Sequence, residues 1–325
     1  MFIKQKICYD KNAGINYLNL MRDNKKKRER VHMTHEQIME QANAVKTMLN
    51  ACEWGKIIPS IWTVPEGYKL VRSTVKGIPV ERLIPENWNG KTLLNMHGGG
   101  YVLALSDLYR EGAVVYSQVA GNAEVINFDY RTAPTHEAPA ALEDAVTVYQ
   151  WLLEQGTKPE DIVFIGDSAG GNLVLVTGLY LRDQKMPLPA GIFAISPWGS
   201  MESDLNSVKE NWEKDYLLGK EGIDAATEVF DTTYHKNSDF KSPYVSPAYG
   251  DYTGMPSLLI QGGSYEVLLD GIVMVGEAVK KAGIDFTFSI YEEMPHVFQI
   301  ALPELEQSKK AWAEAKMFFD KVFAK

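Results

Sequence analysis

The residue with the clearest chemical potential is Ser168, which lies in the GxSxG pattern formed by Gly166–Gly170. An apolar run typical of a buried strand, Ile162–Ile165, precedes this pattern, and a helical pattern begins near Asn172. A sharp turn between a strand and a helix exposes a serine hydroxyl, and the positive end of the helix favours an oxyanion beside it. The spacing therefore predicts that Ser168 is a nucleophile that attacks an ester carbonyl. The alternative for this motif alone is an ordinary glycine-rich turn.

A second glycine motif follows the apolar run Leu93–Met96 and begins with His97. Attack on a carbonyl creates a negative oxygen that needs N–H donors held in place beforehand, and glycines let the backbone approach it without a Cβ atom. The expected donors of this oxyanion hole are the backbone N–H groups of Gly98, Gly99, Gly100 and Ala169. The sequence does not decide which of the glycines point inward. We expect His97 to shape the loop rather than to transfer a proton.

A serine nucleophile needs a general base, and the chain has six histidines. In chains with this type of serine turn, the acid and then the base follow the nucleophile in sequence. Only His235 and His296 follow Ser168. His235 lies in a polar stretch and is expected at the surface, whereas His296 follows a predicted strand and a short loop. We predict that His296 is the base.

Two carboxylates compete for the role of the acid that orients His296. Both follow the predicted strand Ser257–Ile260, where an acid would reach the imidazole. Glu266 is nearer the strand end and is the preferred candidate. Asp270 lies one helical turn further on and is the alternative, because it could instead brace the loop.

The elements that must position these residues alternate along the chain as strands and helices. This order predicts an α/β fold with a mostly parallel central sheet and helices on both faces, and such sheets carry their sites at the carboxyl ends of the strands. Residues 61–325 form the expected catalytic domain. Residues 1–60 have helical spacing, and the aromatic stretch 198–250 interrupts the alternation as an insertion, so both are expected to form a helical cap. Trp198 directly follows a predicted core strand, and we expect it near a substrate pocket.

Composition excludes several other classes of protein. A formal net charge of −9 disfavours nucleic acid as a partner. Cys8 and Cys52 form no CxxC pair and have no histidine cluster beside them, so we expect neither a metal nor a cofactor. The first residues lack the apolar run of a signal peptide, and no stretch is long enough to span a bilayer. We expect a cytoplasmic protein whose partner is a small-molecule ester, and a homodimer stays open.

Taken together, the motifs resemble those of the hormone-sensitive-lipase-like esterases, also called bacterial family IV esterases, which have the α/β-hydrolase fold. Five motifs carry the resemblance, in the order of that family, over roughly residues 90–320: residues 97–101, 130–134, 139–144, 166–172 and 294–298. The resemblance implies a cap, an oxyanion hole from the glycine loop with Ala169, and activity on short-chain acyl esters. It also implies that Tyr130, Arg131 and Asp144 stabilise loops. Many members carry Asp where this chain has Glu266, which keeps Asp270 open as the acid.

Three functions remain on the sequence. The preferred one is a serine carboxylesterase that hydrolyses short-chain acyl esters through an acyl-enzyme. The same residues could cleave a lactone or an N-acyl group, because a serine triad attacks amides too. The third is a non-catalytic binding protein of the same fold. Plant gibberellin receptors are of this kind but lack the triad histidine, whereas His296 is present in this chain.

Overall fold

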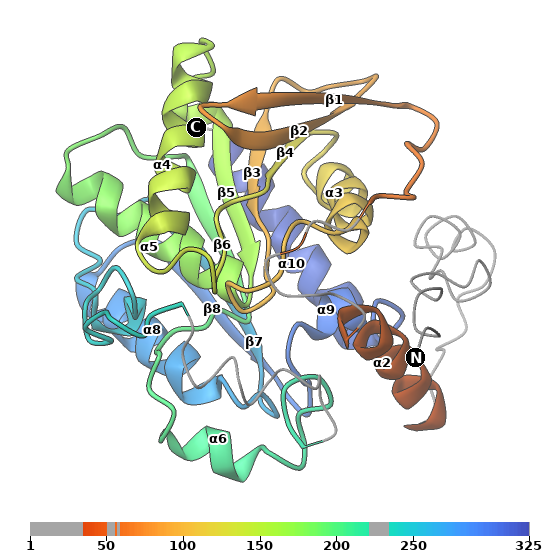
Figure 1. The fold of residues 1–325 in the computed structure, drawn as a ribbon, viewed down its shortest axis with the longest axis vertical. Coiled ribbons are helices and arrows are strands. Elements are labelled where there is room, and N and C mark those ends of the chain that lie inside the picture. The colour runs from red at the N-terminus through yellow and green to blue at the C-terminus, as the bar shows by residue number, and fades with distance from the viewer. Residues whose placement is uncertain (1–34, 51–55, 57–58, 221–233, 325) are drawn as a thin grey trace.

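A single eight-stranded sheet forms the centre of the molecule (Figure 1). The computed structural model describes residues 35–50, 56, 59–220 and 234–324. The strands follow one another across the sheet in the order β1-β2-β4-β3-β5-β6-β7-β8. Their bounds are β1 Tyr68–Val75, β2 Ile78–Pro85, β3 Thr92–Met96, β4 Glu124–Phe128, β5 Ile162–Asp167, β6 Gly191–Ile195, β7 Ser257–Gly263 and β8 Phe286–Tyr291.

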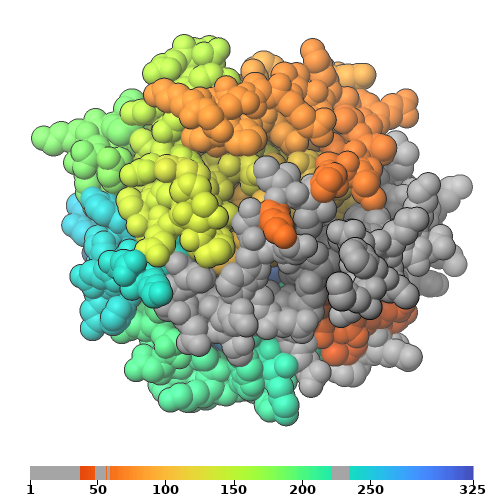
Figure 2. Space-filling model, in the orientation of Figure 1, coloured from red at the N-terminus to blue at the C-terminus, as the bar shows by residue number. Residues whose placement is uncertain are grey.

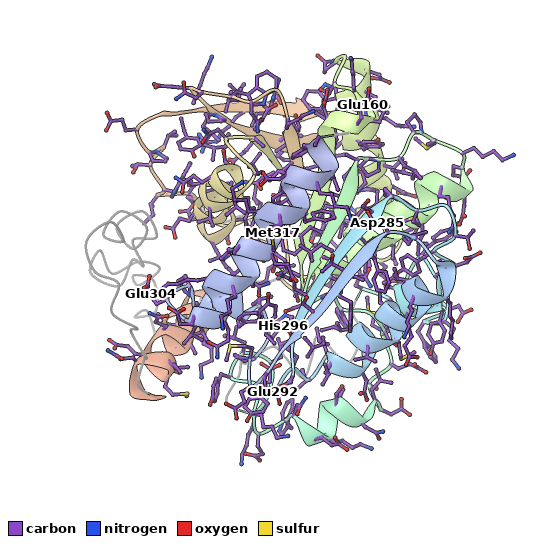
Figure 3. All side chains as sticks on the ribbon, turned by 180° about the vertical axis from the view of Figure 1, so that it is seen from behind. Glu160, Asp285, Glu292, His296, Glu304 and Met317 are labelled. Carbon is purple, nitrogen blue, oxygen red and sulfur yellow. The ribbon has the colours of Figure 1, made fainter. Side chains whose placement is uncertain are left out.

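The strands from β3 to β8 are parallel, and only the pairs β1–β2 and β2–β4 are antiparallel. Parallel strands place all their carboxyl ends at one edge of the sheet. Figure 3 shows this polarity from behind: Glu160 and Asp285, which precede β5 and β8, lie toward the upper end, whereas Glu292 and His296 follow β8 and lie at the lower end. The predicted catalytic residues therefore belong to the lower edge in this view.

Helices cover both faces of the sheet, as the alternation of elements predicted. On one face, α4 (Ala140–Glu154), α5 (Ala169–Asp183) and α8 (Leu269–Ala282) pack against the strands in one large apolar core. On the other face, α3 (Asp107–Val119) and α10 (Glu306–Phe323) enclose a second apolar core (Figure 1). Strands β3 to β7 are buried along their whole length, which explains why they appear in the sequence as continuous apolar runs rather than as alternating patterns.

The predicted cap is only partly described. Helix α2 (His35–Asn50) represents the N-terminal part, and its Ala42 and Val45 share an apolar cluster with Leu217 of the insertion and with α9 (Phe298–Ala301). The rest of residues 1–60, apart from residues 56, 59 and 60, lies outside the described residues, as do Cys8 and Cys52. Within the described part of the 198–250 insertion, regular structure is limited to α6 (Asn206–Glu210) and the 3-10 helix η3 (Pro247–Tyr249). Figure 2 shows this part along the lower and left margins of one face, opposite the β1–β2 hairpin.

Polar groups of helix α10 join it to the sheet and to α9. The carboxylate of Glu314 accepts hydrogen bonds from Gln261 of β7 and Ser289 of β8. Nearer the start of α10, the indole N–H of Trp312 donates to the carbonyl of Gln299, and the hydroxyl of Ser308 donates to the carbonyl of Leu302. These bonds fix the segment that directly follows His296.

Candidate active site

Ser168 occupies a strained turn between β5 and α5. Its φ of 56° and ψ of −120° are unfavourable for a residue with a side chain, and such strain persists only where neighbours enforce it. Here the Ser168 N–H donates to the carbonyl of Ile195 at 2.9 Å, and its own carbonyl accepts the N–H of Trp198 at 3.0 Å. Gly166 and Gly170 are required on either side, because a Cβ atom at either position would clash with backbone atoms. Ser168 remains partly exposed although its neighbours on both sides are buried.

Helix α5 begins at Ala169, three residues before the predicted start near Asn172. The N–H groups of a first helical turn have no acceptor within the helix, so the N–H of Ala169 is available to a ligand beside Ser168. Asn172 does not begin the helix but links three loops. Its side-chain amide donates to the carbonyls of Trp198 and Val245, and its oxygen accepts the hydroxyl of Tyr101 at 2.7 Å.

Glu266 and His296 form a buried pair at the same edge of the sheet. Oε2 of Glu266 lies 2.9 Å from Nδ1 of His296, and both side chains are almost fully buried. Burial lowers the pKa of the His296 imidazole. The hydrogen bond and charge of Glu266, together with the charges of Asp215 and Asp167, raise this pKa by more than burial lowers it. The pKa of His296 therefore lies above its ordinary value. Burial raises the pKa of the Glu266 carboxyl, against the lowering effect of His296. The pair has the geometry in which a carboxylate orients an imidazole.

Ser196, at the end of β6, joins this pair to the neighbouring strand. Its hydroxyl donates to Oε1 of Glu266 at 2.7 Å and accepts the N–H of Val297 at 3.1 Å. The N–H of Gly263 also donates to Oε1 of Glu266. Ser196 therefore fixes both the side chain of Glu266 and the backbone after His296. Sequence reasoning missed it, although its position directly after the strand Gly191–Ile195 was a signal that could have been used.

Asp270 lies elsewhere. It belongs to the first turn of α8, and its Oδ2 accepts the N–H of Ser207 in α6 at 3.0 Å, while the N–H of Asp270 donates to the hydroxyl of Ser207. This reciprocal contact joins the insertion to the catalytic domain. The structure thus places Glu266 beside His296. Asp270 instead makes bracing contacts, which is the second role that the sequence left open for it.

The glycine loop after β3 lies against the Ser168 turn. Gly99 and Gly100 have φ values of 107° and 62°, which residues with side chains rarely adopt. Gly98 lies directly against the carboxylate of Asp167. A Cβ atom at Gly98 would overlap Oδ2 of Asp167 and would lie 2.7 Å from the hydroxyl of Tyr109. None of the three positions accommodates a side chain without strain or overlap, and Gly98, Gly99 and Gly100 all stay predicted donors together with Ala169.

His97 is part of the loop scaffold. It is fully buried, its Nδ1 lies 2.8 Å from the carbonyl oxygen of Gly98, and its ring stacks on Tyr130 with 4.1 Å between centroids. The hydroxyl of Tyr130 donates to the carbonyl of His97. Burial lowers the pKa of His97, so the imidazole is neutral at pH 7. These contacts agree with the expectation that His97 shapes the loop.

The sequence of this chain is similar to those of known hydrolases. Residues 93–300 match the α/β-hydrolase fold family. The chain belongs to this family. An acetyl-hydrolase of Streptomyces hygroscopicus is 38% identical over 245 residues, which cover 75% of this chain and 80% of that protein. An esterase of Acinetobacter venetianus is 33% identical over 228 residues, covering 70% and 73% of the two chains.

Solved structures give the same assignment. A crystal structure of an esterase/lipase from an uncultured bacterium has a TM-score of 0.75 and 32% identity, and covers 88% of this chain and 99% of that chain. An esterase from the bacterial hormone-sensitive lipase family has a TM-score of 0.73 and 31% identity, and covers 94% and 96%. The resemblance to hormone-sensitive-lipase-like esterases and the predicted fold class are thereby confirmed.

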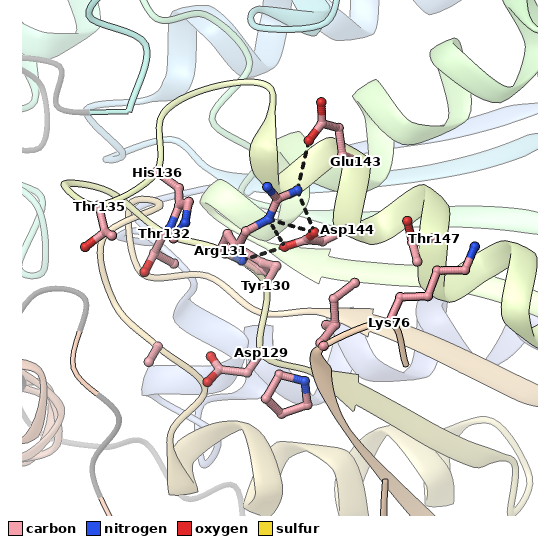
Figure 4. Close-up of a pocket in the computed structure, with 14 residues that line it drawn as sticks. Lys76, Asp129, Tyr130, Arg131, Thr132, Thr135, His136, Glu143, Asp144 and Thr147 are labelled. Atoms are coloured by element: carbon pink, nitrogen blue, oxygen red, sulfur yellow. Dashed lines mark hydrogen bonds and ion pairs between the residues drawn. The ribbon is translucent and has the colours of Figure 1, made fainter. Parts of the chain in front are cut away.

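In this α/β hydrolase, the motif at residues 130–134 stabilises a loop through Arg131. Arg131 contacts both Asp144 and Glu143 of α4, at 2.8 Å in each case. Figure 4 shows this cluster in the wall of an open polar cavity of about 700 Å³. Ser168, Glu266 and His296 do not line this cavity. It is therefore separate from the candidate active site.

Trp198 and His235 lie together within the 198–250 insertion. Trp198 is buried, and its backbone N–H binds the Ser168 carbonyl as described above. The ring of His235 stands almost perpendicular to that of Trp198, with 6.0 Å between centroids. The prediction that His235 lies at the surface is wrong, because only 5% of the residue is exposed. Its polar sequence neighbours gave that impression, whereas apolar packing from Trp198 decides its position.

The described residues contain neither a candidate metal centre nor a helix that could span a membrane. In this part of the chain, no group of three or more His, Cys, Asp or Glu side chains is arranged to hold a metal ion. The helices of the same residues are all too short or too polar to cross a bilayer.

Proposed function

We propose that this protein is a serine carboxylesterase that hydrolyses short-chain acyl esters, with Ser168, His296 and Glu266 as nucleophile, base and acid. The observation that carries the proposal is the buried Glu266–His296 pair at the sheet edge where the strained Ser168 turn also lies. A carboxylate on Nδ1 holds the imidazole so that Nε2 accepts a proton. Membership of the α/β-hydrolase family and the similarity to named esterases support ester hydrolysis as the reaction.

The reaction proceeds by ping-pong acyl transfer. His296 takes the hydroxyl proton of Ser168, and the oxygen attacks the ester carbonyl. The N–H groups of the glycine loop, from Gly98, Gly99 or Gly100, and the N–H of Ala169 stabilise the resulting oxyanion. His296 then protonates the departing alcohol, and water releases the acyl group by the same steps. In this mechanism the chain uses its own residues alone.

A small acyl group is the proposed substrate feature. The support is the name of one relative, the acetyl-hydrolase of Streptomyces hygroscopicus, which is 38% identical to this chain. A series of p-nitrophenyl esters from acetate to palmitate, run beside several lactones and N-acyl amides, tests the proposal. We expect kcat/KM to be highest between acetate and hexanoate. A preference for palmitate would refute the short-chain proposal, and a preference for lactones would favour the alternative with the same triad.

A further inference from the structure

One buried carboxylate of the insertion contacts both loops that carry the proposed acid and base. Asp215 follows α6 and is 2% exposed. Its Oδ2 accepts the N–H of Val267, the residue after Glu266, at 3.0 Å. Its Oδ1 accepts the N–H of His296 at 3.3 Å. A single side chain thus holds the backbone beside the acid and the backbone of the base.

Asp215 is itself held in one orientation. Oδ1 also accepts the N–H groups of Leu217 and Leu218, which form the turn after Asp215. Both carboxylate oxygens are therefore occupied as acceptors. Four N–H donors directed at one carboxylate fix its rotamer.

The same part of the insertion makes further bonds to the Glu266 loop. The side-chain amide of Asn211 donates to the carbonyls of Ser264 and Glu266, at 3.0 Å and 2.8 Å. The hydroxyl of Ser207 donates to the carbonyl of Val267 at 2.9 Å. Residues 207–215 therefore lie along the loop that carries Glu266 and form a polar seam with it. Asp215 is the member of this seam that also reaches His296.

We propose that Asp215 is a positioning residue for the reaction, through which the insertion sets the relative placement of Glu266 and His296. The inference rests on the proposed function and deepens it. Catalysis by a triad depends on sub-ångström placement, and a small displacement of the base lowers turnover more than it changes substrate affinity. The insertion is then part of the catalytic framework as well as a cover.

The charges around His296 supply a readout that a purely structural role would not move. Glu266, Asp215 and Asp167 are the ionisable groups that face this imidazole, and each of them raises its pKa. Removal of the charge of Asp215 should lower the pKa of His296. The acid limb of the pH profile of kcat/KM reports the pKa of the base in the free enzyme. In a variant without the Asp215 charge, this limb should therefore shift to lower pH.

The test is Asp215→Asn, measured on p-nitrophenyl butyrate. An amide offers one acceptor oxygen where the carboxylate uses two, so either Val267 or His296 loses its partner. We expect kcat to fall about 10- to 100-fold, KM to change less than about threefold, and the acid limb to shift to lower pH. The matched control is Asp270→Asn, which alters another insertion contact, that with Ser207, and should leave the acid limb in place.

Asp215→Glu separates charge from placement. It keeps the negative charge but displaces it by one methylene, so kcat should fall while the acid limb stays near that of the wild type. If Asp215→Asn does not fold, Asp215→Glu decides alone. Wild-type kcat and an unmoved acid limb in Asp215→Asn, wild-type kcat in Asp215→Glu, or loss of the fold in both variants would each overturn the proposal.

An NMR titration of the His296 imidazole makes the test independent of the substrate. We expect a lower pKa in Asp215→Asn than in the wild type, and equal values would contradict the inference. A wild-type protein without esterase activity would refute the proposed function, whereas the titration would still decide whether Asp215 is coupled to His296.

Discussion

Oε2 of Glu266 lies 2.9 Å from Nδ1 of His296, although 30 positions separate the two residues in the sequence. The pair is buried on all sides, and Ser196 occupies the other carboxylate oxygen. In this arrangement the proton of the imidazole is held at Nδ1, and Nε2 is the nitrogen that can accept the proton of a nucleophile. Each of the following predictions depends on this pair or on the groups that support the serine turn.

The first prediction concerns the nucleophile and the base. Ser168→Ala and His296→Ala should each lower kcat on p-nitrophenyl acetate by roughly 10³-fold or more, because each removes a group that makes or breaks a bond. The double variant should be little worse than either single one, since the two residues act as a unit. Circular dichroism serves as the control for folding. Near-normal turnover in either folded variant would remove the triad.

The second prediction ranks the two carboxylates. Glu266→Gln should lower kcat by about 10²- to 10⁴-fold, because the imidazole loses its charged partner. Asp270→Asn should cost less than about tenfold, because an amide oxygen can still accept the N–H of Ser207. Both are measured as kcat with the same ester. The reverse ranking would transfer the acid role to Asp270.

The third prediction concerns the glycine loop. In Gly98→Ala the added Cβ atom would overlap the Asp167 carboxylate and lie 2.7 Å from the hydroxyl of Tyr109. The loop must move, and we expect a loss of about 1–3 kcal/mol in the free energy of unfolding and at least tenfold in kcat. Gly112→Ala in α3 is the matched control, because its Cβ would meet Tyr116 at an ordinary 3.4 Å. Equal behaviour of the two variants in urea denaturation and turnover would show that the loop tolerates displacement.

The fourth prediction concerns Asp167. Burial raises the pKa of its carboxyl from 3.8 to about 6, against the lowering effects of His296, Tyr109 and Gly98. The folded protein therefore binds more protons here than the unfolded chain between pH 4 and 6, and this group makes the protein less stable as pH rises through that window. Relative to Asp167→Asn, the wild type should lose on the order of 2–3 kcal/mol between pH 4 and 7. Parallel pH profiles of the two proteins in urea denaturation would contradict the raised pKa.

Much of the framework could be predicted from the sequence, because buried parallel strands are continuous apolar runs with clear ends. The predicted runs Leu93–Met96 and Ile162–Ile165 lie within β3 and β5 and are one and two residues shorter than those strands. The start of α5 was predicted three residues too late, since no propensity signals that a helix begins inside a glycine-rich turn. The choice between Glu266 and Asp270 depended on side-chain direction, which spacing leaves open.

The supporting residues were harder to predict for a physical reason. Ser196 and Asp215 act through backbone N–H groups of distant loops, and a backbone partner leaves no mark in the sequence. Asp215 also lies in a polar insertion, where a carboxylate would ordinarily be solvated. Its burial comes from the packing of the insertion onto two loops that are far away along the chain.

Helix α10 has a consequence for the time at which the protein becomes active. Ser308 and Trp312 fix α9, the segment that follows His296, and Glu314 binds side chains of β7 and β8. These residues are synthesised after Ser168, the glycine loop and Glu266. A nascent chain in which α10 is still inside the ribosome would therefore carry the serine turn without the helix that anchors the segment after His296. A fusion or truncation that disturbs α10 would therefore displace the segment after His296 and lower activity, although it leaves the serine turn intact.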